Sequence, residues 1–144
     1  MDKNQLETLV REVLWEQLGC RCTVLHGVRK VNVSALRTTE ADRMDTGNAA
    51  DKVYTHDLFT LEQSPRLGAG LMEMENTTFA WTLNYDEMDY VIEGELTILI
   101  GGEKVSAGPG EIIYIPKGTS IQFSVSGRAR FLYFVYPADW QNQK

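Results

Sequence analysis

From Val53 onward, short runs rich in β-branched and aromatic residues alternate with turn residues about every ten positions. The runs include VYTHDLFTLEQ, TTFAWTLN, ELTILIGG and SIQFSVSG, and glycine-containing turns such as IGGEKV and SAGPGE lie between runs of this kind. Evenly spaced short strands are typical of all-β sandwiches and barrels. The pattern therefore predicts a mainly β barrel over residues 53–137, followed by a short C-terminal tail, 138–144.

The first 19 residues have a different pattern, because their apolar residues recur at helical spacing. Asp2 and Gln5 predict a capping box at the start of the helix, and Gly19 stands where a helix-ending glycine belongs. A single helix of this length is marginal in water. Its apolar stripe must therefore be buried, either on its own domain or on another protein. The stripe consists of Leu6, Leu9, Val10, Val13, Leu14 and Leu18.

Residues 20–52 read as a partly irregular lead-in and linker. The run LRTTEADRMDTGNAAD, which starts at Leu36, has few large apolar side chains and predicts a loop. Cys20 and Cys22 have the wrong spacing for a C-x-x-C redox or zinc pair. We expect them to be buried thiols, as lone cysteines usually are.

Composition excludes several classes of function. The chain has 144 residues, enough for one domain with a substantial core. A net charge of -6 and the lack of a dense Lys/Arg run argue against nucleic-acid binding. No apolar run approaches the roughly 20 residues that span a bilayer, and the N-terminus lacks the layout of a signal peptide. These features predict a cytoplasmic protein.

Two motifs in the second half resemble those of the cupin family. EMDYVIEGEL, which contains Glu87, is similar to the end of the first cupin motif. GPGEIIYIPKGTSIQF, with Gly110, Pro116 and Gly118, is similar to the second motif. The two stand in the right order, about 20 residues apart, and the resemblance covers roughly residues 53–136. It implies a single-domain cupin, a double-stranded β-helix or jelly-roll barrel.

The resemblance also shows where a cupin metal would bind. Metal-binding cupins use three histidines and a glutamate, but here Trp81, Leu83 and Ile121 occupy the histidine positions and only Glu87 is retained. One carboxylate without imidazoles cannot form an ordinary zinc, iron or manganese site. His56, on another strand, would still leave too few ligands. We therefore expect no bound transition metal.

Glu87 and Asp89 stand two residues apart in a predicted strand, so both should point inward while Met88 and Tyr90 point outward. Two buried carboxylates cannot both ionise cheaply, so one pKa should rise or a cation should enter. We expect an apolar pocket with an acidic edge, a usual shape for a small-molecule site. Its lining would include Trp81, Leu83, Ile121 and Phe123.

A structural role for the two carboxylates stays open. They could accept hydrogen bonds from backbone amides or from the hydroxyls of Tyr85, Tyr114 and Tyr133. They could also pair with Arg66 or Lys117. In that case the carboxylates would stabilise the barrel and take no part in chemistry.

Within the cupins, the chain resembles the EutQ family of ethanolamine-utilisation proteins. The similarity runs along GLMEMENTTFAWTLNYDEMDYVIEGELTI, in a short acidic cupin without the histidines. The segment LETLVREVLWEQL resembles the encapsulation peptides of bacterial microcompartment cargo enzymes. The resemblance implies a microcompartment-associated transferase with acetate kinase activity, which converts acetyl phosphate and ADP to acetate and ATP. Mg-ATP or Mg-ADP would then be the cofactor.

Candidate site residues follow from this reading. We expect Glu87, Asp89 and Lys117 to be catalytic, since phosphoryl transfer needs charge around the developing anion. A Walker-type phosphate loop is absent from the sequence, so PKGTS, from Pro116, is the candidate phosphate contact, although it is equally a cupin turn. The expected substrate-binding residues are Trp81, Leu83, Tyr85, Tyr114, Ile121 and Phe123.

Two hypotheses from other classes of function remain open. The chain could be a non-enzymatic assembly factor, a homodimer formed through its sheets and recruited to the microcompartment shell by the helix. It could also be a cupin that senses a small acid or aldehyde metabolite in the apolar pocket.

Overall fold

The structure is a computed structural model and describes residues 2–17 and 23–143. It divides into two compact units, Met1–Arg37 and Thr38–Lys144. Within the part of the chain described, none of the helices is long and apolar enough to cross a bilayer.

The N-terminal unit contains the predicted helix α1 (Lys3–Gln17), the hairpin strands β1 (Thr23–Leu25) and β2 (Val28–Lys30), and a 3-10 turn, η1 (Val33–Ala35). The predicted capping box is present: the Gln5 amide donates to Asp2 Oδ1 at 2.8 Å, and the Asp2 amide donates to Gln5 Oε1 at 3.0 Å. Leu6, Leu9 and Val10 are exposed. The predicted glycine cap and both cysteines lie outside the described residues.

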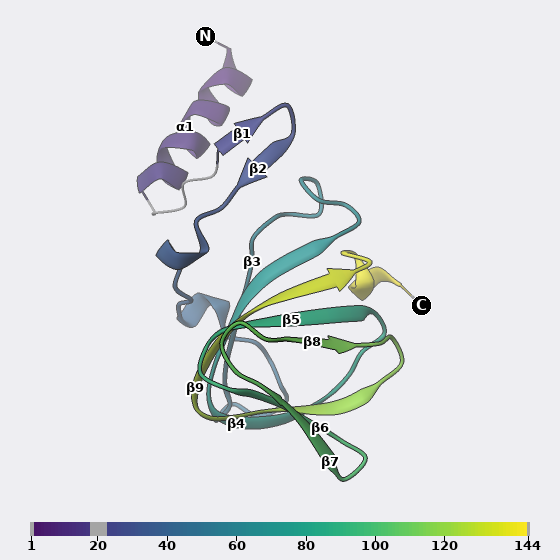
Figure 1. Cartoon of the computed structure of the whole chain (residues 1–144). Helices are drawn as coiled ribbons and strands as arrows, with labels where there is room; N and C mark the ends of the chain where they lie inside the picture. The colour runs from purple at the N-terminus through teal and green to yellow at the C-terminus, as the bar shows by residue number, and fades with distance from the viewer. Residues whose placement is uncertain (1, 18–22, 144) are drawn as a thin grey trace. The chain divides into compact units, whose positions relative to one another are not determined.

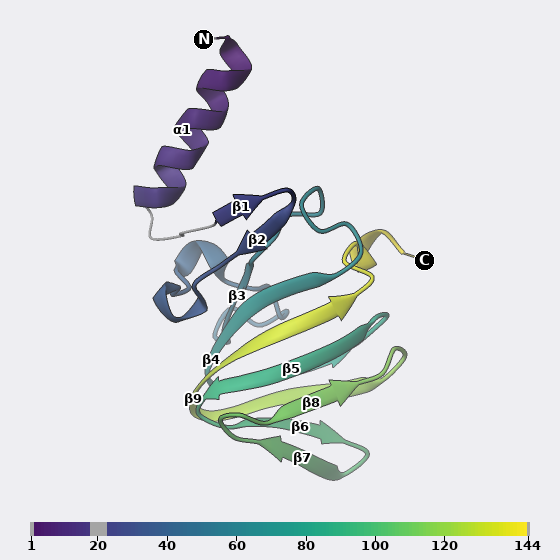
Figure 2. The ribbon, with the colours of Figure 1, turned by 45° about the horizontal axis from the view of Figure 1, so that its top comes forward.

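The second unit is mainly β, as the sequence predicts (Figure 1). Its elements are η2 (Glu40–Asp42), β3 (Lys52–Asp57), β4 (Gly68–Thr82), β5 (Asp86–Glu93), β6 (Leu96–Ile100), β7 (Glu103–Ala107), β8 (Ile112–Ile115), β9 (Ser120–Tyr136) and η3 (Trp140–Asn142). The strand order is β3-β4-β9-β5-β8, and β6 pairs with both β7 and β9 (Figure 2).

The long strands β4 and β9 belong to both layers of the barrel. The N-terminal half of β4 pairs with β3 and with the C-terminal half of β9, which also pairs with β5. The other halves pair with each other, and that part of β9 continues to β6. The register shifts between Glu75 and Thr77, where the Gly127 amide donates to Asn76 Oδ1 at 2.7 Å. Left-handed backbone at Asn76 and Gly127 accommodates this irregularity.

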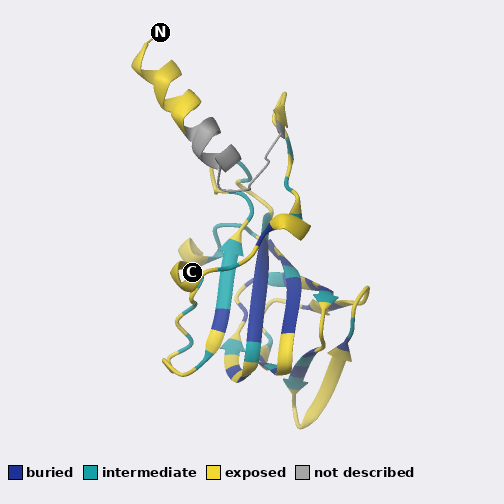
Figure 3. Ribbon diagram, turned by 90° about the vertical axis from the view of Figure 1, so that its left-hand side faces the viewer, coloured by how far each residue is buried: buried dark blue, intermediate teal, exposed yellow. Residues whose placement is uncertain are grey.

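The core fills the space between the two layers. Buried and exposed residues alternate along β5, β8 and β9, as expected for strands with one face inward. By contrast, β7 is exposed over most of its length (Figure 3). Each large apolar side chain that is fully buried in the core stabilises the fold by about 1.5–3 kcal/mol. The largest apolar ones in the core include Phe123, Phe131, Met74, Leu83 and Leu96.

Residues 38–51 belong to the barrel unit, although their polar composition predicts a linker. The Met44 amide donates to the Val53 carbonyl at 2.8 Å, and Arg43 forms a bridge with Tyr54. The Arg43 guanidinium also donates to the Asp51 carbonyl at 2.8 Å. Backbone pairing makes most of these contacts, which explains why composition did not reveal them. The compact unit therefore begins upstream of the boundary predicted at residue 53.

Candidate functional site

Glu87 and Asp89 form a buried pair of carboxyl groups, here called the acid pair. They lie on β5, between β8 and β9: Glu87 is opposite Ile115 and Val135, and Asp89 is opposite Ile113 and Tyr133. Glu87 is 4% exposed and Asp89 0%. Met88 and the next outward residue of β5 are exposed, so the predicted inward direction of both carboxyl groups agrees with the structure.

The acid pair lacks donors and counter-charges. Among the described residues, Oε1 of Glu87 and both carboxylate oxygens of Asp89 have no hydrogen-bond partner. No lysine, arginine or histidine of the described chain is among the groups that shift the pKa of either acid. An ionised pair would therefore hold two uncompensated charges in the core, which is very costly.

Burial raises the pKa of Glu87 to about 7. Burial, followed by the charge of Glu87, raises the pKa of Asp89 well above its usual range. The pair thus holds a proton at neutral pH.

Three aromatic residues, Trp81, Tyr85 and Trp140, form a cluster that we call the aromatic cap. The Trp81 indole N–H donates to the Tyr85 hydroxyl at 2.8 Å, and burial, followed by the charge of Glu87, raises the pKa of Tyr85. The Trp140 ring lies 4.5 Å from the Tyr85 ring and 6.2 Å from the Trp81 ring, between centroids. Asn84 Nδ2 donates to the Trp140 carbonyl at 3.2 Å. The cap therefore joins the C-terminal segment to the turn between β4 and β5.

Tyr133 links the other side of the pair to the barrel edge. Asp89, Tyr133, Gly70 and Asp57 are successive register partners across four strands. The Tyr133 ring lies over Gly70, where a Cβ would collide with it, and its hydroxyl donates to Asp57 Oδ1 at 2.6 Å. Burial and Asp57 raise the pKa of Tyr133. The Tyr133 hydroxyl thus donates to Asp57 and not to the acid pair.

Four of the expected substrate-binding residues share the inward surface with the acid pair. Leu83, Ile121 and Phe123 are buried in the core, and Trp81 is partly buried against it. Phe123 stacks on Phe79 with ring centroids 5.3 Å apart. These residues therefore belong to the packed apolar core.

Tyr114 and Lys117 lie away from the acid pair. Tyr114 is half exposed and opposite Met88, on the outer face of the sheet. Its hydroxyl donates to Asp86 Oδ1 at 3.2 Å, and the Lys117 amide donates to the same atom at 2.8 Å. Tyr114 therefore does not face the acid pair, because strand alternation gives the inward positions of β8 to the isoleucines on either side of it.

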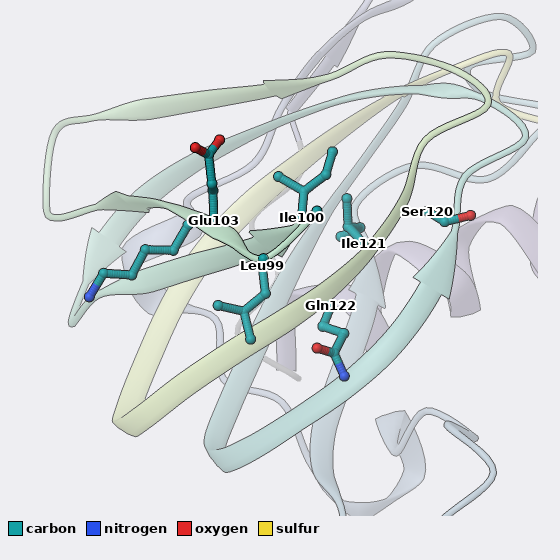
Figure 4. A pocket seen from close by; sticks show the side chains of 9 residues that line it. Leu99, Ile100, Glu103, Ser120, Ile121 and Gln122 are labelled. Carbon is teal, nitrogen blue, oxygen red and sulfur yellow. The ribbon is translucent and has the colours of Figure 1, made fainter.

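A groove of about 660 Å³ lies at the turn between β6 and β7, beside the start of β9 (Figure 4). It is lined by Leu99, Ile100, Gly101, Gly102, Glu103, Lys104, Ser120, Ile121 and Gln122. Ile121 is also a core residue. The lining includes neither member of the acid pair, so groove and pair are separate features.

The acid pair does not fit a hydrated magnesium ion. Mg²⁺ keeps several water ligands in proteins, whereas these carboxyl groups are almost completely buried. Across residues 2–17 and 23–143, no three His, Cys, Asp or Glu side chains are grouped so that they could hold a metal ion.

Comparison with known proteins decides the family. The family model described as "Ethanolamine utilisation protein EutQ" matches residues 1–142. The chain belongs to the EutQ family. It is 56% identical to a Clostridioides difficile protein named "Acetate kinase EutQ", over 99% of this chain and 96% of the relative. A Salmonella typhimurium EutQ protein of the same name is 46% identical, but the match spans only 49% of its length.

Solved structures confirm the expected cupin fold. The Clostridium difficile EutQ structure is 58% identical, with a TM-score of 0.82 over 85% of this chain and 98% of that one. A cupin domain from an Enterobacter cloacae transcriptional regulator has a TM-score of 0.52 at 17% identity, over 58% of this chain and 95% of that one. The EutQ chain described here is therefore a cupin barrel with an N-terminal helix.

Sequence reasoning missed two parts of the EutQ site. Trp140 lies in a polar tail without periodic pattern, and an isolated tryptophan there was the one available signal. Asp57 reaches Tyr133 across 76 residues of sequence. A contact between residues this far apart in sequence can be predicted only when the strand order is known.

Proposed function

We propose that this EutQ protein is an acetate kinase of ethanolamine utilisation, which converts acetyl phosphate and ADP to acetate and ATP. The observation that carries the proposal is 56% identity, over nearly the whole of both chains, to a protein named as an acetate kinase. The site adds a buried, protonated acid pair, since strongly perturbed carboxyl groups are enriched at catalytic sites.

The acid pair is the proposed acid–base group. As the bond between phosphorus and the acetyl oxygen breaks and ADP's terminal oxygen bonds to phosphorus, the pair gives a proton to the departing acetate oxygen. Acetic acid returns the proton when it ionises. A group with a pKa near 7 suits this exchange. Because Asp89 is fully buried, the substrate reaches the pair only when the side chains packed around it move.

ATP formation tests the proposal directly. Purified full-length protein is mixed with acetyl phosphate and Mg-ADP, and ATP is followed by a coupled assay. Magnesium would accompany the nucleotide, because the acid pair does not fit it. Lack of ATP formation under conditions where the protein is folded would overturn the proposal.

The N-terminal helix supports a location in the cytoplasm, inside a bacterial microcompartment. Leu6, Leu9 and Val10 lie on one exposed stripe of α1. Single apolar residues on a surface are ordinary, but three on one stripe of a short helix suit docking on an apolar groove. We therefore propose that α1 binds a shell or cargo protein.

We expect a double Leu6→Glu, Leu9→Glu variant to lose this location, because charges on the stripe oppose burial. Fluorescent fusions in cells that form ethanolamine microcompartments should change from puncta to diffuse signal. Thr8→Glu adds the same kind of charge on the opposite side of α1 and should leave puncta intact. Puncta that persist in the double variant would contradict targeting by this stripe.

A second candidate function is a non-enzymatic assembly factor, favoured by the same exposed stripe. Under this alternative the acid pair is structural. Loss of puncta in the helix variant together with absence of ATP formation by the wild type would favour it. A metabolite sensor would instead bind acetate or acetyl phosphate without turnover, which titration calorimetry detects.

An apolar face on the outside of the sheet supports a homodimer. Large side chains on β5, β8 and β9 adjoin one another there, each 40–57% exposed. They are Met88, Tyr90, Ile112, Tyr114, Phe134 and Tyr136. Since aromatic side chains bury about 150–250 Å² each, the four half-exposed aromatic residues alone offer on the order of 400 Å². A stable dimer buries about 800 Å² per partner, so we propose a second copy as the occupant.

Met88→Lys should separate the proposed dimer. Met88 lies between Tyr114 and Phe134 in the register, at the middle of the apolar face. A two-fold interface would bring two copies of the new charge into an apolar contact. Light scattering after gel filtration should give twice the chain mass for wild type and the single mass for the variant. Val105→Lys, on exposed β7, should remain dimeric, and a monomeric wild type would contradict the proposal.

A further inference from the structure

The groove at the β6–β7 turn lies where two strands of the barrel separate. Leu99 and Gln122 form the last pair between β6 and β9 at this end. The next residue of β6, Ile100, and the preceding residue of β9, Ile121, both line the groove (Figure 4). Its volume of about 660 Å³ lies within the usual range of small-molecule sites, about 300–1,000 Å³. The separated strands therefore leave a space of ligand size with an apolar side chain on each strand.

The proposed kinase reaction needs a site for ADP, and the acid pair is too deeply buried to be that site. A second pocket has a volume of about 180 Å³, which is below the usual range of small-molecule sites. Its lining includes Glu40, Glu73 and Glu75 beside Arg128. Three carboxylates would repel the phosphates of a nucleotide. The groove is therefore the better candidate for ADP.

The β6–β7 end of the groove suits the base of an adenine nucleotide. Gln122 is exposed, and a glutamine amide can pair with the N6 and N7 atoms of adenine. Leu99, its register partner on β6, is half-buried, and Ile100 is 40% exposed. These two side chains offer apolar surface to the face of a purine ring, which the aliphatic wall would remove from water.

The other end of the groove continues into the turn PKGTS. Ser120 lines the groove, and Lys117 is exposed three residues before it. Ser120 Oγ lies 2.9 Å from the Thr82 hydroxyl, so it can accept from Thr82 and donate to a phosphate oxygen. Gly118 has a φ of 88° and open space where a Cβ would stand, which lets a ligand approach its backbone. An exposed ammonium, a hydroxyl and an open glycine together suit a diphosphate.

The PKGTS turn also lies at the end of the barrel where β5 begins. The Leu83 amide donates to the Thr119 carbonyl at 3.0 Å, and the Gly118 amide donates to the Leu83 carbonyl at 2.7 Å. Ile115, just before the turn, is the register partner of Glu87. A diphosphate bound at this turn would therefore lie at the same end of β5 as Glu87.

We propose that the groove and the PKGTS turn together bind Mg-ADP, with the adenine beside Gln122 and the diphosphate beside Lys117. The Lys117 ammonium then offsets the negative charge of the phosphates, as phosphoryl transfer requires. The catalytic meaning of this site rests on the proposed acetate kinase reaction. Binding of Mg-ADP is measured without a phosphoryl donor, so failure of the kinase assay and failure of this assignment are distinguishable.

The test is isothermal titration calorimetry of the full chain with Mg-ADP, GDP with magnesium, and adenosine. Wild type should bind one Mg-ADP per chain. Lys117→Gln should weaken Mg-ADP binding by about 10-fold or more, but should leave adenosine binding unchanged because adenosine carries no phosphate. Gln122→Leu removes the amide and keeps a side chain of similar size, so it should weaken binding of both adenine ligands and reduce the preference for ADP over GDP.

Lys52→Gln is the matched control. It removes the same charge from an exposed lysine on β3, outside both the groove and the turn, and should bind Mg-ADP as wild type does. Circular dichroism verifies that each variant is folded. Absence of Mg-ADP binding to wild type, or wild-type affinity in folded Lys117→Gln or Gln122→Leu, would overturn the assignment. Binding that depends on both residues, without ATP formation, would support the site and count against the kinase reaction.

Discussion

Replacing Glu87 by glutamine should lower the rate of ATP formation from acetyl phosphate and ADP by about 100-fold or more, since positioned acid–base groups contribute about 10²–10⁴. Glutamine has nearly the same shape, so the barrel should stay folded. Its amide cannot exchange a proton. The effect should appear in kcat, because the proton moves only as the phosphoryl group is transferred.

The neighbouring carboxylate provides the control for this experiment. Asp86 is the residue before Glu87, but its side chain accepts bonds from Tyr114 and from the Lys117 amide on the outer face. Asp86→Asn should change the rate by no more than a few-fold. If folded Glu87→Gln protein turned over at the wild-type rate, the catalytic role of the acid pair would be wrong even where the kinase activity itself is real.

Stability should fall as pH rises through neutrality, which is the second large effect. The pKa of Glu87 is about 7 in the folded chain, against 4.5 for an ordinary glutamate. The folded state therefore binds this proton more tightly than the unfolded state. The associated stability is complete below about pH 4.5 and is lost as pH rises through 7. The difference between these two pKa values corresponds to about 3 kcal/mol of unfolding free energy.

Urea denaturation of the barrel between pH 5 and pH 8 measures this loss. Asp89→Asn should make the unfolding free energy depend less on pH. The neutral amide removes the charge repulsion between the two acids and can donate a hydrogen bond to the ionised Glu87. At pH 8 the variant should be more stable than wild type by about 1–3 kcal/mol. Asp86→Asn should keep the wild-type slope. A wild-type stability that does not change over this range would show that the pair gains no proton on folding.

Strand alternation allowed the acid pair to be predicted from sequence. The period of two along β5 places Glu87 and Asp89 inward and Met88 outward, whatever the rest of the fold. The same rule applied to β8 places Tyr114 outward, so it could have shown that the Tyr114 hydroxyl does not reach the acid pair. Cupin spacing of Gly110, Pro116 and Gly118 then fixed the topology by resemblance.

Long-range contacts account for most of what sequence did not predict. Trp140 reaches Tyr85 because the chain after β9 returns to the β4–β5 turn, where its backbone is held by Asn84. The segment after Thr38 pairs with β3 through backbone groups, which leave no trace in composition. In each case the contact depends on where strands lie in space and not on the local pattern.

Because β4 and β9 run without interruption through both layers, the barrel has no seam along which it could come apart in two halves. Partial unfolding of one layer would also disrupt the other layer, because both contain β4 and β9. The barrel unit should therefore melt in a single cooperative step. Its many non-local strand pairings should make refolding slow for a chain of this size, a property that mutations in the aromatic cap, at one end of the fold, would leave nearly unchanged.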